Sequence, residues 1–136
     1  MISEALLQKY RQTDYIIDDD PPLLVNIGEQ NDGLRILFAS FNVESAAFIT
    51  AWNPHGRKLT LDENYDRQIE LLEDISNQRL NYFVGRGESQ TGDWSEDSYL
   101  VLGVSLTDAK EIANRHEQNA FVWIPVSGVP ELIECR

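Results

Sequence analysis

The stretch LRILFASFNVESAAFITAW, residues 34–52, contains two apolar runs, 34–41 and 45–52, joined by a short connection around Asn42. Runs of this length that are rich in β-branched and aromatic residues are typical of strands. A short connection between two such runs favours antiparallel pairing. The stretch therefore predicts two neighbouring strands of an antiparallel sheet.

The chain on either side of this stretch predicts helices that alternate with further strands. A capping box, Thr60 with Glu63, marks the start of the clearest helix, and Ser105 with Asp108 has the same spacing at the start of another. The N-terminal residues 3–12 have a helical spacing of apolar residues, whereas the Asp-rich and Pro-rich residues 18–22 predict a loop. The remaining predicted strands are 23–27, 82–84, 99–104, 120–124 and 131–133, and residues 85–93 are predicted to form a loop.

This order of elements predicts an α+β fold: a largely antiparallel sheet with about three helices packed on it. At 136 residues, of which 42% are hydrophobic, the chain is expected to form a single domain, 1–136. In the helix that follows Thr60, one set of residues is predicted to face the core and another to face water. The first set is Leu61, Tyr65, Ile69, Leu72 and Ile75; the second is Asp62, Asp66, Glu70, Glu73 and Asp74.

The charge of the chain restricts its partners. A formal net charge of -12 repels nucleic acid, so nucleic-acid binding is not expected. The same charge is compatible with an acidic protein-interaction or inhibitor module, a DNA mimic included. The single cysteine, Cys135, favours a reducing compartment, and no apolar run is long enough to cross a bilayer. We therefore expect a cytoplasmic protein without membrane spans.

Two segments combine a bulky aromatic residue with polar side chains. Trp52 ends an apolar run and is followed by Asn53 in a turn, an arrangement that suits either core packing with an Asx-turn or a ligand stacked on the indole. Trp94 and Glu96 lead from a loop into an apolar strand, where Glu96 either faces water or acts as an acid or base whose pKa is raised beside the indole. Both interpretations stay open at each segment.

A third segment, Gln118 and Asn119, joins a helix to an apolar strand. These two amides are either a helix terminator with a surface residue or a pair of hydrogen-bonding groups that recognise a base, sugar or amide. His55 and His116 are separated by a helix and three predicted strands, and with a single cysteine in the chain no metal site and no cofactor are predicted.

The strings Thr-Ala-Trp-Asn-Pro, residues 50–54, and Gln-Asn-Ala, residues 118–120, together with Asn64 and Trp94-x-Glu96-x-Ser98, resemble a family of small bacterial proteins known only as a domain of unknown function. The resemblance covers residues 45–125. Asp97 departs from the proline expected between Glu96 and Ser98. The resemblance implies that the family's polar pattern falls on Thr50, Trp52, Asn53, Asn64, Glu96, Ser98, Gln118 and Asn119, and it implies no activity.

These observations support three hypotheses, and they leave the oligomeric state open. The first is a pocket for a small, nucleotide-like molecule, with walls of Trp52 and Trp94, polar contacts from the other matched side chains, and Glu96 as the acid or base if the protein is an enzyme. The alternative is the acidic interaction module, with the helix over residues 61–78 as its face. A third is a nuclease-like or transferase-like fold that uses Glu96 and His55.

Overall fold

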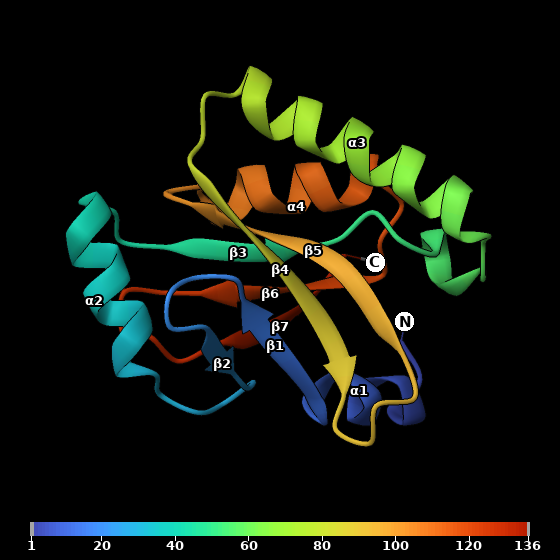
Figure 1. The fold of residues 1–136 in the computed structure, drawn as a ribbon, viewed down its shortest axis with the longest axis horizontal. Helices are drawn as coiled ribbons and strands as arrows, with labels where there is room; N and C mark the ends of the chain where they lie inside the picture. The colour runs from blue at the N-terminus through green and yellow to red at the C-terminus, as the bar shows by residue number, and fades with distance from the viewer. Residues whose placement is uncertain (1, 136) are drawn as a thin grey trace.

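The computed structural model describes residues 2–135. It confirms the α+β fold, with a seven-stranded sheet and four α-helices (Figure 1). The helices are α1 (Glu4–Arg11), α2 (Asp32–Phe41), α3 (Leu61–Asn77) and α4 (Leu106–Arg115), with a short 3-10 turn η1 (Pro54–Gly56). The strands are β1 (Thr13–Ile17), β2 (Leu23–Val25), β3 (Ala46–Ile49), β4 (Tyr82–Ser89), β5 (Ser95–Leu102), β6 (Ala120–Ile124) and β7 (Glu131–Glu134).

All strand pairs are antiparallel, in the order β2-β1-β4-β5-β3-β6-β7. Because successive side chains of a strand point to opposite faces, the central strands supply two cores. Ala46 and Phe48 of β3 belong to the core shared with α2, whereas Ala47 and Ile49 belong to the core under α3 and α4. Figure 1 shows α3 and α4 together on one side of the sheet. Within residues 2–135, no helix combines the length and hydrophobicity needed to cross a membrane.

The prediction of a strand over residues 34–41 was wrong, because this segment is helix α2. The Asn31 side chain accepts a hydrogen bond from the Leu34 amide and so caps the helix, and Asn42 ends it in the left-handed conformation with φ 54°. Leu34, Leu37 and Phe38 are buried at helical spacing. The cap and this spacing were both present in the sequence, and they outweigh the β propensity of the run.

The sheet is also larger than predicted. Strand β1, which the sequence analysis missed, lies between β2 and β4. Strand β4 continues to Ser89 through residues predicted to be a loop, and β5 begins at Ser95, four residues before the predicted start. The long β4–β5 hairpin therefore replaces a short strand followed by a loop, and α2 is a fourth helix in addition to the three predicted.

The antiparallel order brings distant segments to one edge of the sheet. Strand β3 ends at Ile49, and its two neighbours, β5 and β6, run in the opposite direction and begin near that point. Strand β1 begins and β4 ends at the same edge, where Thr13 pairs with Ser89. Helix α1 ends directly before β1, so it also lies at this edge. This edge thus collects the candidate segments around residues 50–53, 94–98 and 118–119.

Candidate functional site

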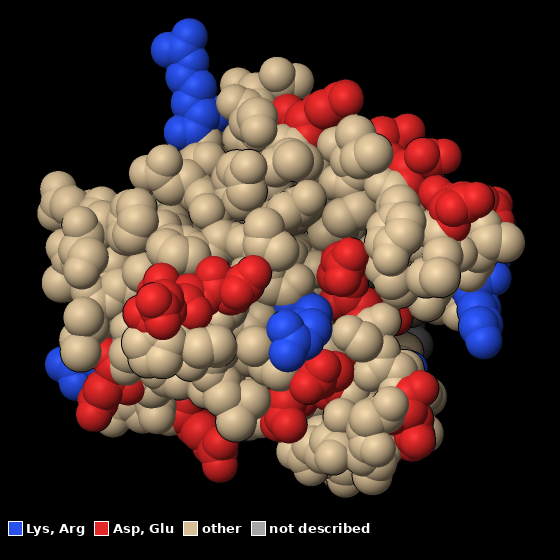
Figure 2. Space-filling view, viewed as in Figure 1, with Lys and Arg blue, Asp and Glu red and all other residues tan. Residues whose placement is uncertain are grey.

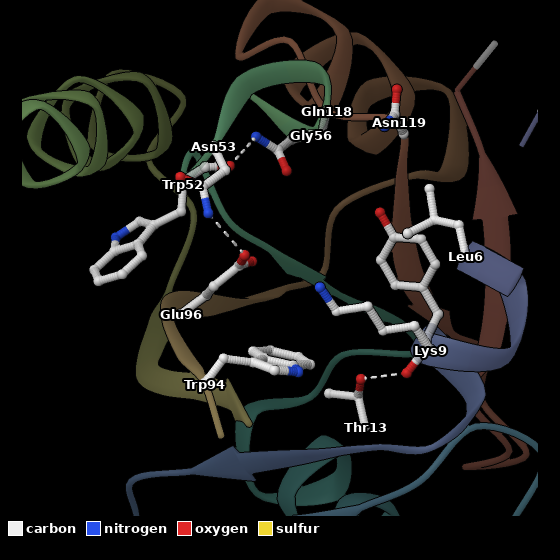
Figure 3. A pocket seen from close by; sticks show the side chains of 11 residues that line it. Leu6, Lys9, Thr13, Trp52, Asn53, Gly56, Trp94, Glu96, Gln118 and Asn119 are labelled. Atoms are coloured by element: carbon white, nitrogen blue, oxygen red, sulfur yellow. Dashed lines mark hydrogen bonds between the residues drawn. The ribbon is translucent and has the colours of Figure 1, made fainter. Parts of the chain in front are cut away.

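A small cavity lies at this edge of the sheet, between α1 and the ends of the central strands (Figure 3). Its volume is about 110 Å³, and a second chamber of about 60 Å³ shares lining residues such as Glu96 and Trp94 with it. The first chamber is lined by six residues singled out from the sequence: Trp52, Asn53, Trp94, Glu96, Gln118 and Asn119. Thr50 and Ser98 line the second chamber. The fold therefore brings eight of the nine candidate side chains together.

The two chambers differ in character. The first contains the ionisable side chains of Lys9 and Glu96. Walls of the second include the core side chains of Tyr15, Phe48 and Val122. The combined cavity therefore has a polar part that opens toward α1 and an apolar part that reaches into the sheet.

Asn53 is held in a conformation that asparagine seldom adopts. Its φ is 47°, and His55 and Gly56 in the same loop have φ 51° and 79°. Left-handed backbone costs a non-glycine residue about 1–2 kcal/mol and persists only where surrounding contacts enforce it. Here the Asn53 side-chain oxygen accepts a hydrogen bond from the Leu59 amide at 3.0 Å. This loop geometry directs Asn53 Nδ2 to Glu96 Oε1, at 3.3 Å.

Asn64, the ninth candidate, lies outside the cavity and positions Asn53. Its Oδ1 accepts a hydrogen bond from the Asn53 amide at 2.9 Å, and its Nδ2 donates to Asn53 Oδ1 at 3.1 Å. The side chain is buried on the inner face of α3. Asn64 therefore joins α3 to the loop instead of contacting a ligand.

Replacing Asn64 by alanine is expected to lower the free energy of unfolding by about 1–3 kcal/mol, because the Asn53 amide and side-chain oxygen would both lose a partner. Urea unfolding followed by circular dichroism measures this change. Asn77→Ala, at an exposed position at the end of the same helix, is the matched control and is expected to be close to neutral. Equal stabilities of the two variants would contradict the positioning role.

Glu96 is the carboxyl group of the cavity. Burial raises the pKa of Glu96, and the hydrogen bond from Asn53 and the positive charge of Lys9 act against this rise. Within residues 2–135, Glu96 Oε2 accepts no side-chain hydrogen bond. The group is thus a partly desolvated carboxyl with one oxygen available to a ligand.

Lys9 and Trp94 form the opposite side of the polar chamber. The Lys9 ammonium lies 4.7 Å from the centroid of the Trp94 ring, within cation–π distance. Figure 3 shows the Lys9 side chain extending from α1 across the cavity toward Glu96, above the indole of Trp94. The Trp94 face therefore already accommodates one nitrogen cation.

Trp52 contributes differently from Trp94. Figure 3 shows its indole directed away from Lys9 and Glu96. The ring packs edge-on against Tyr65 of α3, with 5.8 Å between centroids. Its backbone oxygen accepts a hydrogen bond from Gln118 Nε2 at 3.1 Å. Trp94 is therefore the aromatic wall of the cavity, and Trp52 supports it from the α3 side.

Gln118 and Asn119 come from the segment before β6. Gln118 is buried, and its Nε2 also donates to the backbone oxygen of His116, at 3.2 Å. With this nitrogen bound to the protein, Figure 3 shows the side-chain oxygen on the cavity side. The Asn119 backbone oxygen accepts a hydrogen bond from the Cys135 amide at 2.8 Å, which fixes the segment to the C-terminal end of β7.

The two remaining matched side chains hold the start of β5. Thr50 Oγ1 donates to the Asp97 backbone oxygen at 2.6 Å and accepts from the Trp52 amide at 3.1 Å. Ser98 Oγ donates to the Glu96 backbone oxygen at 3.3 Å. Both hydroxyls therefore fix the backbone on either side of Glu96, besides lining the apolar chamber.

His55 lies at the rim and is not among the lining residues. Its amide donates to the Glu117 backbone oxygen at 2.6 Å, and its Nδ1 lies 3.9 Å from the Glu117 carboxylate. Arg67 of α3 donates to the backbone oxygens of Ala51 and His116 at 3.0 and 2.9 Å. These contacts connect the loop after β3 to the end of α4. His116 is engaged outside the cavity, where its Nε2 lies 2.9 Å from Asp74.

The sequence analysis missed the contribution of α1, which supplies Leu6, Lys9 and Tyr10 to the cavity. Burial raises the pKa of Tyr10 to about 12, and Glu96 adds to this shift. The helix was predicted, but its position over the far end of β5 depends on strand β1, which the analysis missed. Within residues 2–135, no three His, Cys, Asp or Glu side chains lie close enough together to share a metal ion.

A family model described as "Protein of unknown function (DUF3293)" matches residues 49–121. The chain belongs to the DUF3293 family. This confirms the resemblance to a domain of unknown function. No curated protein and no solved structure matches the chain.

The part that matches DUF3293 extends from the last residue of β3 to the beginning of β6. It contains all nine candidate residues, and with them the Asn53 loop, Glu96 and Gln118. Helix α1 lies outside the matched range. The cavity therefore combines walls from the family region with a cover that comes from the N-terminal part of this chain.

Proposed function

We propose that the cavity binds a planar, nitrogen-containing ring of nucleobase size. The ring stacks on Trp94, and its edge donates hydrogen bonds to Glu96 and Gln118. The single observation that carries this proposal is the partly buried Glu96 carboxyl beside an indole face on which the Lys9 ammonium lies, 4.7 Å from the ring centroid.

The hydrogen-bonding groups support a ligand edge that bears donors. Asn53 Nδ2 is bound to Glu96, and Gln118 Nε2 is bound to two backbone oxygens. This leaves one oxygen of Glu96 and the oxygen of Gln118 as acceptors for a ligand. Buried acceptors without donors are costly, so a ligand that offers amino or ring N–H groups is favoured over one that offers carbonyl oxygens.

The size of the cavity supports a single base over a whole nucleotide. Pockets for drug-sized ligands have volumes of about 300–1,000 Å³. The chambers here, of about 110 and 60 Å³, are smaller. The apolar chamber beside Phe48 and Val122 suits the hydrocarbon edge of a ring. A triphosphate would have to lie outside the cavity, against a chain of net charge -12.

Glu96 is also the group suited to proton exchange with a bound ring. A carboxyl group whose pKa is raised by burial approaches the range in which it both accepts and releases protons near neutral pH. If the protein is an enzyme, we propose that Glu96 is its general acid or base.

Binding of cytosine, adenine and 2,4-diaminopyrimidine, measured by calorimetry and by tryptophan fluorescence, tests the proposal. Uracil, which replaces amino groups by carbonyl oxygens, is the matched ring. We expect the amino-bearing rings to bind at least about tenfold more tightly than uracil, because one lost hydrogen bond to a charged acceptor costs about 1.5–3 kcal/mol. Native mass spectrometry of the purified protein is expected to detect a bound ligand of the same class.

Two tryptophan variants locate the binding event. Quenching of fluorescence by the bound ring is expected to disappear in Trp94→Phe and to remain in Trp123→Phe, since Trp123 packs beside the core under α3 and α4. Failure of all four rings to bind the wild-type protein would contradict the proposal. So would quenching that survives in Trp94→Phe.

A further inference from the structure

Helix α3 presents apolar side chains to solvent. Leu61, Tyr65 and Ile69 were predicted to face the core, and this prediction was wrong: their exposed fractions are 59%, 47% and 55%. Residues buried on the inner face of this half of the helix are Asn64 and Gln68. The helix is thus inverted relative to the usual amphipathic arrangement.

The inversion has a local cause. Asn64 binds the Asn53 loop, and Gln68 Oε1 accepts a hydrogen bond from the buried Ala51 amide at 3.1 Å. The chain after β3 has left the sheet here, so its backbone amides need side-chain partners from α3. Since polar residues occupy the inner face for this purpose, the apolar residues one helical step around lie outside.

Leu61, Tyr65 and Ile69 follow one another at intervals of four residues, so they form one line along the helix, here named the α3 stripe. The line extends over about 12 Å at a rise of about 1.5 Å per residue. Isolated exposed apolar residues are ordinary, but three in a line are a feature of contact surfaces. The stripe has the length and spacing of two turns of a partner helix.

A row of acidic residues accompanies the α3 stripe. Each stripe residue is followed directly by an acid, and the helix continues the row with Glu73; the acids beside the stripe are Asp62, Asp66 and Glu70, all exposed. Figure 2 shows acidic side chains in a row along α3. The one basic residue of the helix, Arg67, is bound to backbone oxygens on the inner side and does not neutralise the row.

The exposed apolar surface continues on the same side of the sheet. Tyr82 of β4 pairs with Val101, which belongs to the core under α3 and α4, so the two side chains share this face. Tyr82 and Val84 are 39% and 51% exposed. The apolar surface on the α3 side is therefore not limited to a single helix.

We infer that the α3 stripe and its acidic row form a docking surface for a cationic amphipathic helix of a partner protein. Apolar side chains of the partner pack on the stripe, and its Lys or Arg residues pair with the acidic row. A second copy of this chain does not fit, because it would bring two acidic rows and two net charges of -12 together. This surface involves Tyr65 and Ile69 and is independent of the ligand proposed for the cavity.

A pair of synthetic 18-residue helical peptides with the same leucine positions tests this inference, one with lysine and one with glutamate at the polar positions. We expect the Leu/Lys peptide to bind, with an affinity that falls as salt is raised, and the Leu/Glu peptide not to bind. Ile69→Ser is expected to weaken binding of the Leu/Lys peptide by at least about tenfold. Fluorescence anisotropy of labelled peptides measures both effects.

The matched control is Ile36→Ser, which removes an isoleucine of α2 that is 67% exposed, and it is expected to bind as the wild type does. Absence of Leu/Lys peptide binding, or equal losses in the two variants, would overturn the inference. Sedimentation of the wild-type protein as a dimer that dissociates in Ile69→Ser would assign the stripe to a second copy instead. Circular dichroism establishes that each variant is folded.

Discussion

Replacing Glu96 by glutamine is expected to weaken binding of an amino-bearing ring by at least about tenfold. Asn53 Nδ2 is a donor, so the new amide must turn its oxygen toward Asn53. Its NH₂ group then faces the cavity, where the ligand also presents donors. The variant therefore loses an acceptor and gains an opposing donor, and calorimetry with cytosine or 2,4-diaminopyrimidine measures the loss.

The same variant is expected to retain full stability at neutral pH, or to gain some. Burial raises the pKa of Glu96, so the folded protein keeps this proton over a pH range in which the unfolded chain has lost it. The contribution of Glu96 to the free energy of unfolding therefore falls as pH rises from the usual carboxyl range through the raised pKa. Glutamine cannot ionise, so the stability of the variant lacks this decrease.

Glu44→Gln is the matched control, since Glu44 is exposed in the connection that leads into the opposite end of β3. It is expected to leave both ring binding and the pH dependence of stability unchanged. Ligand affinity in the wild type is expected to rise with pH as Glu96 ionises. A stability loss in Glu96→Gln with intact ring binding would mean that the carboxyl group is structural.

The largest effect on stability is expected from Gly85→Ala. A Cβ atom at Gly85 would lie 2.6 Å from the Ile16 backbone oxygen and 2.9 Å from the Phe48 ring. The neighbouring strand cannot move away without breaking its pairing with β4. We expect a loss of about 3 kcal/mol in the free energy of unfolding, measured by urea denaturation.

Gly87→Ala provides a control two residues further along the same strand, on the same face. A Cβ atom there meets Thr13 and Tyr15 at ordinary distances of 3.5 and 3.6 Å. We expect this variant to be neutral or slightly stabilising, because alanine restricts the unfolded chain more than glycine does. Similar losses in the two variants would contradict the close approach of β1 and Phe48 at Gly85.

Secondary structure with clear local signals was predictable from the sequence. The capping box of Thr60 and Glu63 is present, and α3 begins where it predicts. The prediction failed where a local signal was overlooked, as with the Asn31 cap of α2, or where long-range pairing decides the structure. Gly85 and Gly87 resemble loop residues, yet close packing of β1 against β4 requires glycine in this strand, and no local pattern reveals that.

Convergence of the candidate residues was predicted, but their individual positions were not. Trp52 and Trp94 have the same chemistry, and only tertiary packing determines that the Trp94 face is the one that Lys9 covers. Likewise, the helical period of α3 indicates which residues share a face and not which face is buried. Asn64 and Gln68 reverse the expected orientation because an irregular backbone segment needs their hydrogen bonds.

Helix α1 covers the cavity without any fully buried residue of its own. Moving it aside would expose little apolar surface, and the seven-stranded sheet would stay paired, because α1 is joined to it only through the turn at Gln12. Ligand exchange at this edge therefore requires only a hinge motion of one short segment, and the rate of entry depends on breaking the contact of Lys9 with Trp94 rather than on opening the protein core.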